Sequence, residues 1–391
     1  MSSLKKCPYP LLPNEPMTKN TNTEQKIDPA TLRILRERID AIDQHILELL
    51  RERLTCAQDI GRRKNLDSRA KWDPERERQI FDRLRVLNDG KFPERPLISI
   101  FREIITTCRL EQQQAQGSVD VAYLGPEGTF SNLAAVKRFG HLAHLLPMPT
   151  IDEIFHAVAH QRVRFGIVPV ENSIEGSVAS SLDSFKTYNV KILSEINLPI
   201  VLNLVNYSGN LEDIKQVVSH PQPLAQCQGW LRKHLPEIPA HPVDSTGAAA
   251  HQAQTDHSLA AVASDLAIKT YDLQVVARGI EDYRDNITRF LVIGESSPSR
   301  SGRDKTSLLL TLVDRPGALY HILNILADRN INLTKIESRP VKGEAGKYMF
   351  FIDFVGHLDD PEIKEACERL RETCASFKWL GSYPRVEESD V

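Results

Sequence analysis

Seven charged or polar side chains stand in the first hundred-odd residues, in a segment whose apolar pattern predicts helix. Apolar residues recur among them at intervals of three and four from Leu32 to Leu50, which is the period of an α-helix. Arg53 and Lys64 are eleven residues apart, so on one helix they fall within roughly 20° of one face and about 16 Å apart along the axis. At that distance two long cationic side chains can lean together and grip a dianion. The seven residues are Arg36, Arg53, Lys64, Asp73, Arg76, Glu77 and Gln112.

Arg36 cannot join this pair from the same helix. It stands seventeen residues before Arg53, which is roughly 25 Å along the axis and about 100° around it. If Arg36 reaches the same ligand, it must come from a second copy of the chain. The spacing therefore suggests an intertwined helical dimer.

A second helix is predicted to begin after Asp73. This residue precedes Pro74, which is the pattern of an N-cap followed by Pro at the first helical position. Asp73, Arg76 and Glu77 then share one face at i, i+3 and i+4. Two interpretations stay open. In one, Asp73 only caps the helix and Arg76 and Glu77 face water, as charged helix faces usually do. In the other, the three side chains belong to the ligand site.

The middle of the chain alternates strands and helices. Its strands lead into turns rich in Gly, hydroxyl and amide side chains, and such a turn at a helix start can offer free N–H groups to an anion. Each turn alone is also compatible with ordinary capping. Together they predict a two-lobed α/β domain with a ligand cleft at strand ends. The turns and the last strand start are 125–131, 171–177, 219–223, 245–250 and 286–290.

The last part of the chain predicts a ferredoxin-like β-α-β-β-α-β domain. Strands are expected over 306–313, 332–341 and 348–356 and near 379–381, with helices over 315–329 and 361–374. The segment is small and poor in polar clusters, so it does not suggest catalysis.

Composition and length set the wider limits. A chain of 391 residues exceeds one ordinary core, and its net charge near −3 gives no sign of a nucleic-acid or anionic-membrane partner. The six scattered cysteines argue for free thiols, no cluster suggests a metal or organic cofactor, and no apolar stretch approaches a membrane span. We expect a soluble cytoplasmic protein with a disordered extension over 1–28 and domains over 29–116, 118–295 and 304–388.

Residues 30–115 resemble the all-helical chorismate mutase domain that bacteria fuse to prephenate dehydratase. The resemblance implies that Arg36 comes from the partner subunit, and that Arg53, Lys64 and Arg76 complete the site. The rearrangement of chorismate to prephenate is pericyclic. Such a site must therefore only hold the compact conformer and stabilise charge growing on the ether oxygen.

The same resemblance assigns the remaining mutase contacts. Asp73 and Glu77 would meet the ring hydroxyl, and Lys64 and Gln112 would hydrogen-bond the ether oxygen, so Lys64, Glu77 and Gln112 are the implied catalytic residues. Cys108 stands where many relatives carry Ser, and a thiol is a weaker donor than a hydroxyl. One substrate contact therefore departs from the family pattern.

Residues 118–295 resemble the prephenate dehydratase domain, whose two lobes are like those of periplasmic binding proteins. The most specific signature is Asn286-Ile-Thr-Arg-Phe290, in which Thr288 is the residue most closely tied to catalysis. The resemblance implies a further set that lines or supports the cleft, namely Glu171, Asn172, Ser219, Gln226 and Arg289.

Residues 304–388 resemble the ACT regulatory domain of this family. Two segments are similar to its phenylalanine-binding motifs, and Tyr320 stands where many relatives have Val. The implied effector residues are Gly317, Ala318, Leu319 and Tyr320, with Glu337, Ser338, Arg339 and Pro340.

The three resemblances occur in the order usual for the family. They imply a bifunctional enzyme of phenylalanine biosynthesis that converts chorismate to prephenate and then to phenylpyruvate, without a cofactor. L-phenylalanine would inhibit it through the ACT domain, and the enzyme would be a homodimer or larger. Two alternatives are a dehydratase whose mutase domain only dimerises the protein, and a non-enzymatic amino-acid sensor.

Overall fold

The computed structural model describes residues 29–66, 74–113, 120–140, 143–312, 315–341 and 347–386. The chain divides after Arg53 into two units. Its N-terminal part is helical, and the helices are α1 (Pro29–Leu66), α2 (Pro74–Asn88) and α3 (Glu94–Gln113). The predicted helix start at Pro74 is confirmed, whereas its predicted N-cap Asp73 lies outside the described residues.

Large apolar side chains of α1 recur at helical spacing and remain exposed. Their exposed fractions run from 37% at Leu32 to 61% at Ile34. A stripe of this kind is typical of a helix face that packs against another element. The other exposed members up to residue 50 are Leu35, Ile39, Ile42, Ile46, Leu47 and Leu49.

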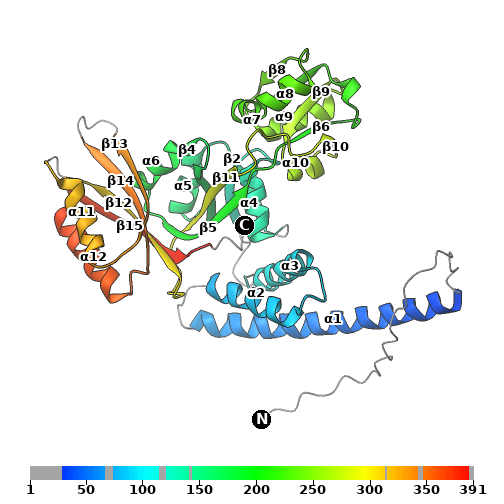
Figure 1. Ribbon diagram of the computed structural model, residues 1–391. Coiled ribbons are helices and arrows are strands. Elements are labelled where there is room, and N and C mark those ends of the chain that lie inside the picture. The colour runs from blue at the N-terminus through cyan, green and yellow to red at the C-terminus, as the bar shows by residue number, and fades with distance from the viewer. Residues whose placement is uncertain are drawn as a thin grey trace, which may run out of the picture. The chain divides into compact units, whose positions relative to one another are not determined.

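The first lobe of the central domain is a six-stranded sheet in the order β2-β1-β3-β11-β5, with β4 paired to β3. β1 is parallel to β2 and β3, whereas β11 is antiparallel to β3 and β5. β11 returns to this sheet after the chain has formed the whole second lobe (Figure 1). The strands are β1 (Asp120–Leu124), β2 (His144–Met148), β3 (Phe165–Asn172), β4 (Gly176–Ser177), β5 (Lys191–Pro199) and β11 (Ile287–Gly294). The helices are α4 (Phe130–Phe139), α5 (Ile151–Ala159) and α6 (Ala179–Thr187).

The second lobe is formed by the segment between β5 and β11. Its five-stranded sheet has the order β10-β6-β9-β7-β8. The strands are β6 (Asn203–Asn206), β7 (Gln216–Ser219), β8 (Ala240–Pro242), β9 (Leu259–Ala263) and β10 (Gln274–Ala277). The helices are α7 (Pro221–Gln226), α8 (Gln228–His234), α9 (Thr246–Thr255) and α10 (Asp265–Thr270), with a short 3₁₀ turn η2 (Leu211–Asp213). The expected two-lobed α/β architecture is confirmed.

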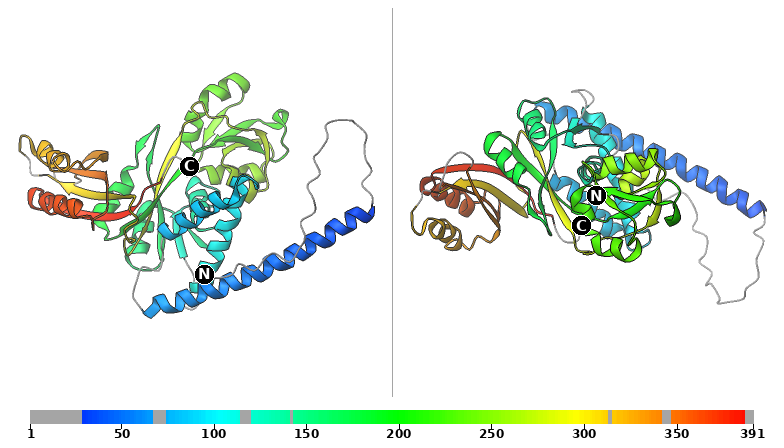
Figure 2. Two further views of the ribbon diagram at one scale, coloured as in Figure 1. Left: turned by 60° about the horizontal axis from the view of Figure 1, so that its bottom comes forward. Right: turned by 90° about the horizontal axis from the view of Figure 1, so that it is seen from above.

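The C-terminal domain has the expected β-α-β-β-α-β order and a four-stranded antiparallel sheet arranged β13-β14-β12-β15. Both of its helices lie on one face of that sheet, as the views in Figures 1 and 2 show. The elements are β12 (Asp304–Thr311), α11 (Ala318–Ala327), β13 (Leu333–Pro340), β14 (Tyr348–Val355), α12 (Pro361–Thr373) and β15 (Ser376–Pro384).

Side-chain alternation along β14 explains how this sheet packs on both faces. Phe350, Ile352 and Phe354 join the core beneath α11 and α12. Met349 and Phe351 point to the opposite face and join the core of the first lobe. Because both faces are buried, β14 is a nearly continuous apolar run, and Asp353 is the charged residue within it.

Several element boundaries differ from the sequence prediction, and two of them have a clear physical cause. The helix expected from Asn132 begins at Phe130, because Thr129 caps it and accepts a hydrogen bond from the Asn132 N–H at 3.3 Å. The strand expected near 379–381 extends over Ser376–Pro384, because it pairs with β12 along the whole length of both strands. Hydrogen bonding to a neighbouring strand, which local sequence does not reveal, set this second boundary.

Candidate functional site

Thr288 and Asn172 face one another across two antiparallel strands of the first lobe. They are register partners on β11 and β3, and the Asn172 Nδ2 donates to Thr288 Oγ1 at 2.8 Å. The Asn172 Oδ1 accepts hydrogen bonds from the backbone N–H groups of Ile174 and Glu175, at 3.0 and 3.1 Å. These bonds fix the orientation of the Asn172 amide. Since the Thr288 oxygen accepts from Asn172, its own proton is directed to a different acceptor.

Asn286 extends this arrangement to the second lobe. Its Oδ1 accepts a 2.7 Å hydrogen bond from the Asn172 Nδ2, and its Nδ2 donates to Gln226 Oε1 at 3.0 Å. Gln226 is the last residue of α7 in the second lobe. The hydrogen-bonded series Thr288–Asn172–Asn286–Gln226 therefore joins both lobes. All four residues are buried, with at most 9% of the surface of each exposed.

The Gln226 amide has hydrogen-bonding capacity left over. Its Nε2 is buried and has no hydrogen-bond partner among the described residues. An unpaired buried donor costs free energy, roughly 1–3 kcal/mol in proteins. A donor placed beside the Thr288 cluster can therefore serve a bound polar ligand.

Ser219 supports the second lobe. Its hydroxyl is buried and donates to the Val262 carbonyl at 2.7 Å, which ties β7 to β9. Of the two roles that the sequence left open for Ser219, lining or supporting the cleft, this contact favours support.

Glu171 and Arg289 lie on the face of the sheet opposite to Asn172 and Thr288. They are register partners and each is the chain neighbour of one of those residues, so side-chain alternation directs them to the other face. Both contact the C-terminal domain. Glu171 pairs with Lys335 at 2.8 Å, and the Arg289 Nη1 is 2.6 Å from the Asp353 carboxylate. These contacts favour a supporting role for both residues.

The Arg289 guanidinium is the centre of a buried network. Its Nε donates to Glu195 at 2.8 Å and its Nη2 to the Tyr383 hydroxyl at 3.0 Å. Glu195 also accepts hydrogen bonds from Lys305 at 2.8 and 2.9 Å. Burial alone would raise the pKa of Glu195, but Arg289 and Lys305 outweigh it and hold that pKa below its ordinary value. Burial alone would likewise lower the pKa of Arg289, yet Asp353, Tyr383 and Glu195 keep it well above normal.

The mutase candidates lie on the three N-terminal helices. Arg36 is exposed and Arg53 partly buried on α1, whereas Arg76 is exposed at the start of α2. Cys108 of α3 is buried, with 6% of its surface exposed. Lys64 and Gln112 belong to α1 and α3, but their side chains, like residue Asp73, lie outside the described part of the structure.

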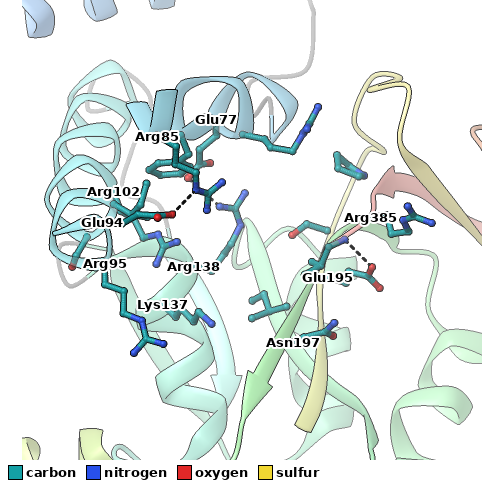
Figure 3. A pocket seen from close by; sticks show the side chains of 18 of the residues that line it. Glu77, Arg85, Glu94, Arg95, Arg102, Lys137, Arg138, Glu195, Asn197 and Arg385 are labelled. Atoms are coloured by element: carbon teal, nitrogen blue, oxygen red, sulfur yellow. Dashed lines mark hydrogen bonds and ion pairs between the residues drawn. The ribbon is translucent and has the colours of Figure 1, made fainter. Parts of the chain in front are cut away.

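Glu77 has a partner that the sequence did not indicate. It is buried, and its carboxylate pairs with Arg138 of α4 at 3.1 Å. Both residues line a cavity of about 920 Å³ in which cations outnumber carboxylates (Figure 3). The lining cations are Arg78, Arg85, Arg95, Arg102, Lys137, Arg138 and Arg385. Such a lining attracts anions. Lys137 and Arg138 were missed because cations in the last turn of a helix are ordinary partners of the helix dipole.

The effector candidates lie in the C-terminal domain. Gly317 precedes α11 with φ of 78°, in the left-handed region that glycine tolerates best. Ala318 and Leu319 begin that helix, and Tyr320 is 66% exposed. The second segment, 337–340, ends the edge strand β13.

Two features of other protein classes are absent from the described residues. Among the described residues, no group of three or more His, Cys, Asp or Glu side chains is arranged to hold a metal ion. Within the same residues, no helix combines the length and hydropathy that a membrane span requires.

A helical domain, a two-lobed α/β domain with a polar cluster between its lobes, and a ferredoxin-like domain define a multidomain enzyme with a C-terminal regulatory module. Three family models match the chain in that order: chorismate mutase type II over residues 35–113, prephenate dehydratase over 121–298 and the ACT domain over 306–372. A bifunctional chorismate mutase/prephenate dehydratase of Aquifex aeolicus is 44% identical, over 91% of this chain and 98% of the relative. The protein of that name from Pseudomonas aeruginosa is 41% identical, over 92% of this chain and 99% of the relative.

A solved structure agrees with these matches. The prephenate dehydratase of Arthrobacter aurescens, in complex with L-Phe, is 35% identical and has a TM-score of 0.64, covering 68% of this chain and 90% of its own. The chain therefore belongs to the family of bifunctional chorismate mutase/prephenate dehydratases. It is an enzyme with a domain for each of the two activities.

Proposed function

We propose that Thr288, oriented by Asn172, is the catalytic hydroxyl of the dehydratase reaction. The observation that supports this is the pair of hydrogen bonds from the Asn172 Nδ2, to Thr288 Oγ1 at 2.8 Å and to Asn286 Oδ1 at 2.7 Å. Gln226, with its unpaired Nε2, would then bind substrate between the lobes.

The chemistry explains what this cluster must do. Prephenate loses its ring hydroxyl as water and its ring carboxylate as carbon dioxide. The electron pair of the broken carbon–carbon bond enters the ring, which becomes aromatic as phenylpyruvate forms. The departing hydroxyl needs a proton, and the carboxylates need polar partners. Thr is a weak acid, so its hydroxyl positions or relays that proton.

For the mutase reaction, the proposed site combines two subunits. Arg36 of one subunit would join Arg53, Lys64 and Arg76 of the other around the two substrate carboxylates. The exposed apolar face of α1 supports a helical dimer, because a second copy of the chain would bury it. The further contacts would come from Asp73, Glu77, Cys108 and Gln112.

The ACT domain is the proposed site of phenylalanine inhibition. Gly317–Tyr320 and Glu337–Pro340 would bind the amino acid. The N-terminus of α11 suits its carboxylate, and polar groups near Glu337 suit its ammonium. The L-Phe complex of the related dehydratase supports this effector.

A turnover assay tests the whole proposal. Purified protein is given chorismate, and prephenate and phenylpyruvate are followed with and without L-phenylalanine. We expect both products, with phenylalanine suppressing the second. Turnover of added prephenate without turnover of chorismate would reduce the helical domain to a dimerisation device. Absence of both reactions would favour the amino-acid sensor.

A further inference from the structure

Four charged residues on paired strands form two ion pairs between the dehydratase and ACT domains. Glu171 and Arg289 are register partners on β3 and β11, and Lys335 and Asp353 are register partners on β13 and β14. Two ion pairs join these strand pairs, Lys335 to Glu171 at 2.8 Å and Arg289 to Asp353 at 2.6 Å. We call these four residues the charge ring. Each member has an oppositely charged register partner on the neighbouring strand of its own sheet. Each also has an oppositely charged ion-pair partner in the other domain.

Two members of the charge ring are chain neighbours of the hydrogen-bonded pair Asn172 and Thr288. Glu171 immediately precedes Asn172, and Arg289 immediately follows Thr288. A displacement of either charged side chain therefore pulls on the backbone that sets the 2.8 Å hydrogen bond between Asn172 and Thr288. The effect reaches the cleft although the charges face away from it.

Lys335 of the charge ring lies on the same strand as the proposed effector segment 337–340. Lys335 lies two residues before Glu337 on β13, and alternate residues of a strand share a face. Arg339, two residues further, also faces the dehydratase domain, with its Nε 4.0 Å from Asp183. β13 is an edge strand with β14 as its neighbour, so it is less restrained than a central strand.

Burial makes the Lys335 contact sensitive to small shifts. The Lys335 side chain is 10% exposed, whereas that of Glu171 is 38% exposed. Its ammonium also donates to Ser177 Oγ at 3.3 Å. If β13 moves, Lys335 cannot exchange Glu171 for water without rearrangement, because a desolvated ammonium needs a partner.

We propose that Lys335 is a positioning residue for the dehydratase reaction, and that phenylalanine inhibits by moving β13 and weakening the Lys335–Glu171 pair. The inference rests on the proposed function, since it takes segment 337–340 as part of the effector site. It adds the connection from that segment to the catalytic strands.

Lys335→Met tests the proposal in the full-length protein. The substitution keeps an apolar stem and removes the charge. We expect kcat for prephenate to fall roughly tenfold with little change in KM, because small displacements of catalytic groups lower rates by up to about a hundredfold. Phenylalanine should still bind in calorimetry but inhibit the remaining activity much less. Lys335→Arg should recover most of the turnover and of the inhibition.

Lys378→Met is the matched control. Lys378 also crosses from the ACT domain to the dehydratase domain, where it donates to the carbonyls of Phe185 at 2.6 Å and Tyr188 at 2.7 Å. Among the described residues, no hydrogen bond or ion pair joins Lys378 to the charge ring, so its loss weakens the junction without altering Glu171. Dehydratase kcat and inhibition should stay near the parental values, and thermal melts report on folding in every variant.

Three results would overturn the inference: parental kcat and inhibition in Lys335→Met, equal damage in Lys335→Arg, or the same loss in Lys378→Met. Failure of the proposed function looks different, because the parental protein itself would then lack prephenate turnover or phenylalanine inhibition.

Discussion

At the scale of single residues, the hydroxyl of Thr288 gives the sharpest test of the dehydratase site. Thr288→Ala removes the oxygen that accepts from Asn172. We expect kcat for prephenate to fall by about 10² or more, which is at the lower end of what a group that positions or transfers a proton contributes. Thr288→Ser keeps the hydroxyl and should retain much more activity.

Steady-state kinetics with prephenate measure this difference. Chorismate turnover provides the control for the amount of active enzyme, since the mutase residues lie in a different domain, and a thermal melt provides the control for folding. Near-parental dehydratase turnover in Thr288→Ala would show that another group carries the proton.

Glu195 gives a prediction about pH. Its pKa is held below the ordinary 4.5, so its contribution to stability is complete above that value and is lost as the pH falls through the lower folded-state pKa. Glu195→Gln removes a buried charge from Arg289 and Lys305 and should lower the free energy of unfolding by roughly 3–5 kcal/mol at neutral pH.

Thermal melts over a pH series check this expectation. The difference between parent and variant should shrink as the solution becomes more acidic than the ordinary carboxyl range. A difference that stays constant into strong acid would mean that the Glu195 charge contributes nothing.

At the scale of elements, the start of α9 controls how closely the two lobes approach. A Cβ atom at Gly247 would lie 2.2 Å from the Glu127 carbonyl oxygen, in the turn before α4. Two hydrogen bonds join the lobes at the same place, from Ser264 Oγ to the Gly128 carbonyl at 3.0 Å and from the Tyr271 hydroxyl to the Glu127 carbonyl at 3.2 Å. The added methyl group of Gly247→Ala must therefore push the backbone at the start of α9 away from the backbone at Glu127.

We expect Gly247→Ala to lower kcat/KM for prephenate about tenfold, since overpacking of a close contact typically costs 1–3 kcal/mol. Chorismate turnover should be unchanged. Gln252→Ala is the matched control, because Gln252 is exposed on the same helix. Parental kcat/KM in Gly247→Ala would mean that the lobes tolerate the added methyl group.

At the scale of the whole molecule, the proposed mutase site predicts complementation between two inactive variants. Arg36→Ala and Arg53→Ala should each lose most chorismate turnover as homodimers. In a mixed dimer, one site takes Arg36 from one chain and Arg53 from the other, while the second site lacks both. Random exchange makes about half the dimers mixed, so the mixture should regain about a quarter of the parental activity.

Chorismate turnover after mixing and exchange of subunits measures this recovery. Parental activity of an isolated monomer, or no recovery on mixing, would contradict a site shared between chains. Light scattering on the same samples separates failure to exchange from failure to complement.

Local patterns in the sequence were enough to predict the three domain types and most of their elements. Apolar periods of two and of three to four residues distinguish strand from helix because side-chain direction repeats along each element. Thr288, Asn172 and Gln226 were selected as candidates because the resemblance to the prephenate dehydratase domain implied them. The sequence also indicated that Arg36 and Arg53 cannot serve one site from one helix.

Strand pairing between distant segments decided which face of the sheet each candidate side chain occupies. Glu171 and Arg289 were expected to line or to support the cleft, and the sequence did not distinguish these roles. The pairing of β3 and β11 turns both side chains toward the ACT domain, which favours support. Their partners come from another sheet, that of the C-terminal domain. Lys335 lies 164 residues beyond Glu171, and Asp353 lies 64 residues beyond Arg289. Contacts between such segments depend on how whole sheets pack, and no local pattern contains that information. The sequence alone thus determined which residues could do chemistry, and the tertiary structure decided which side of the sheet each of them faces.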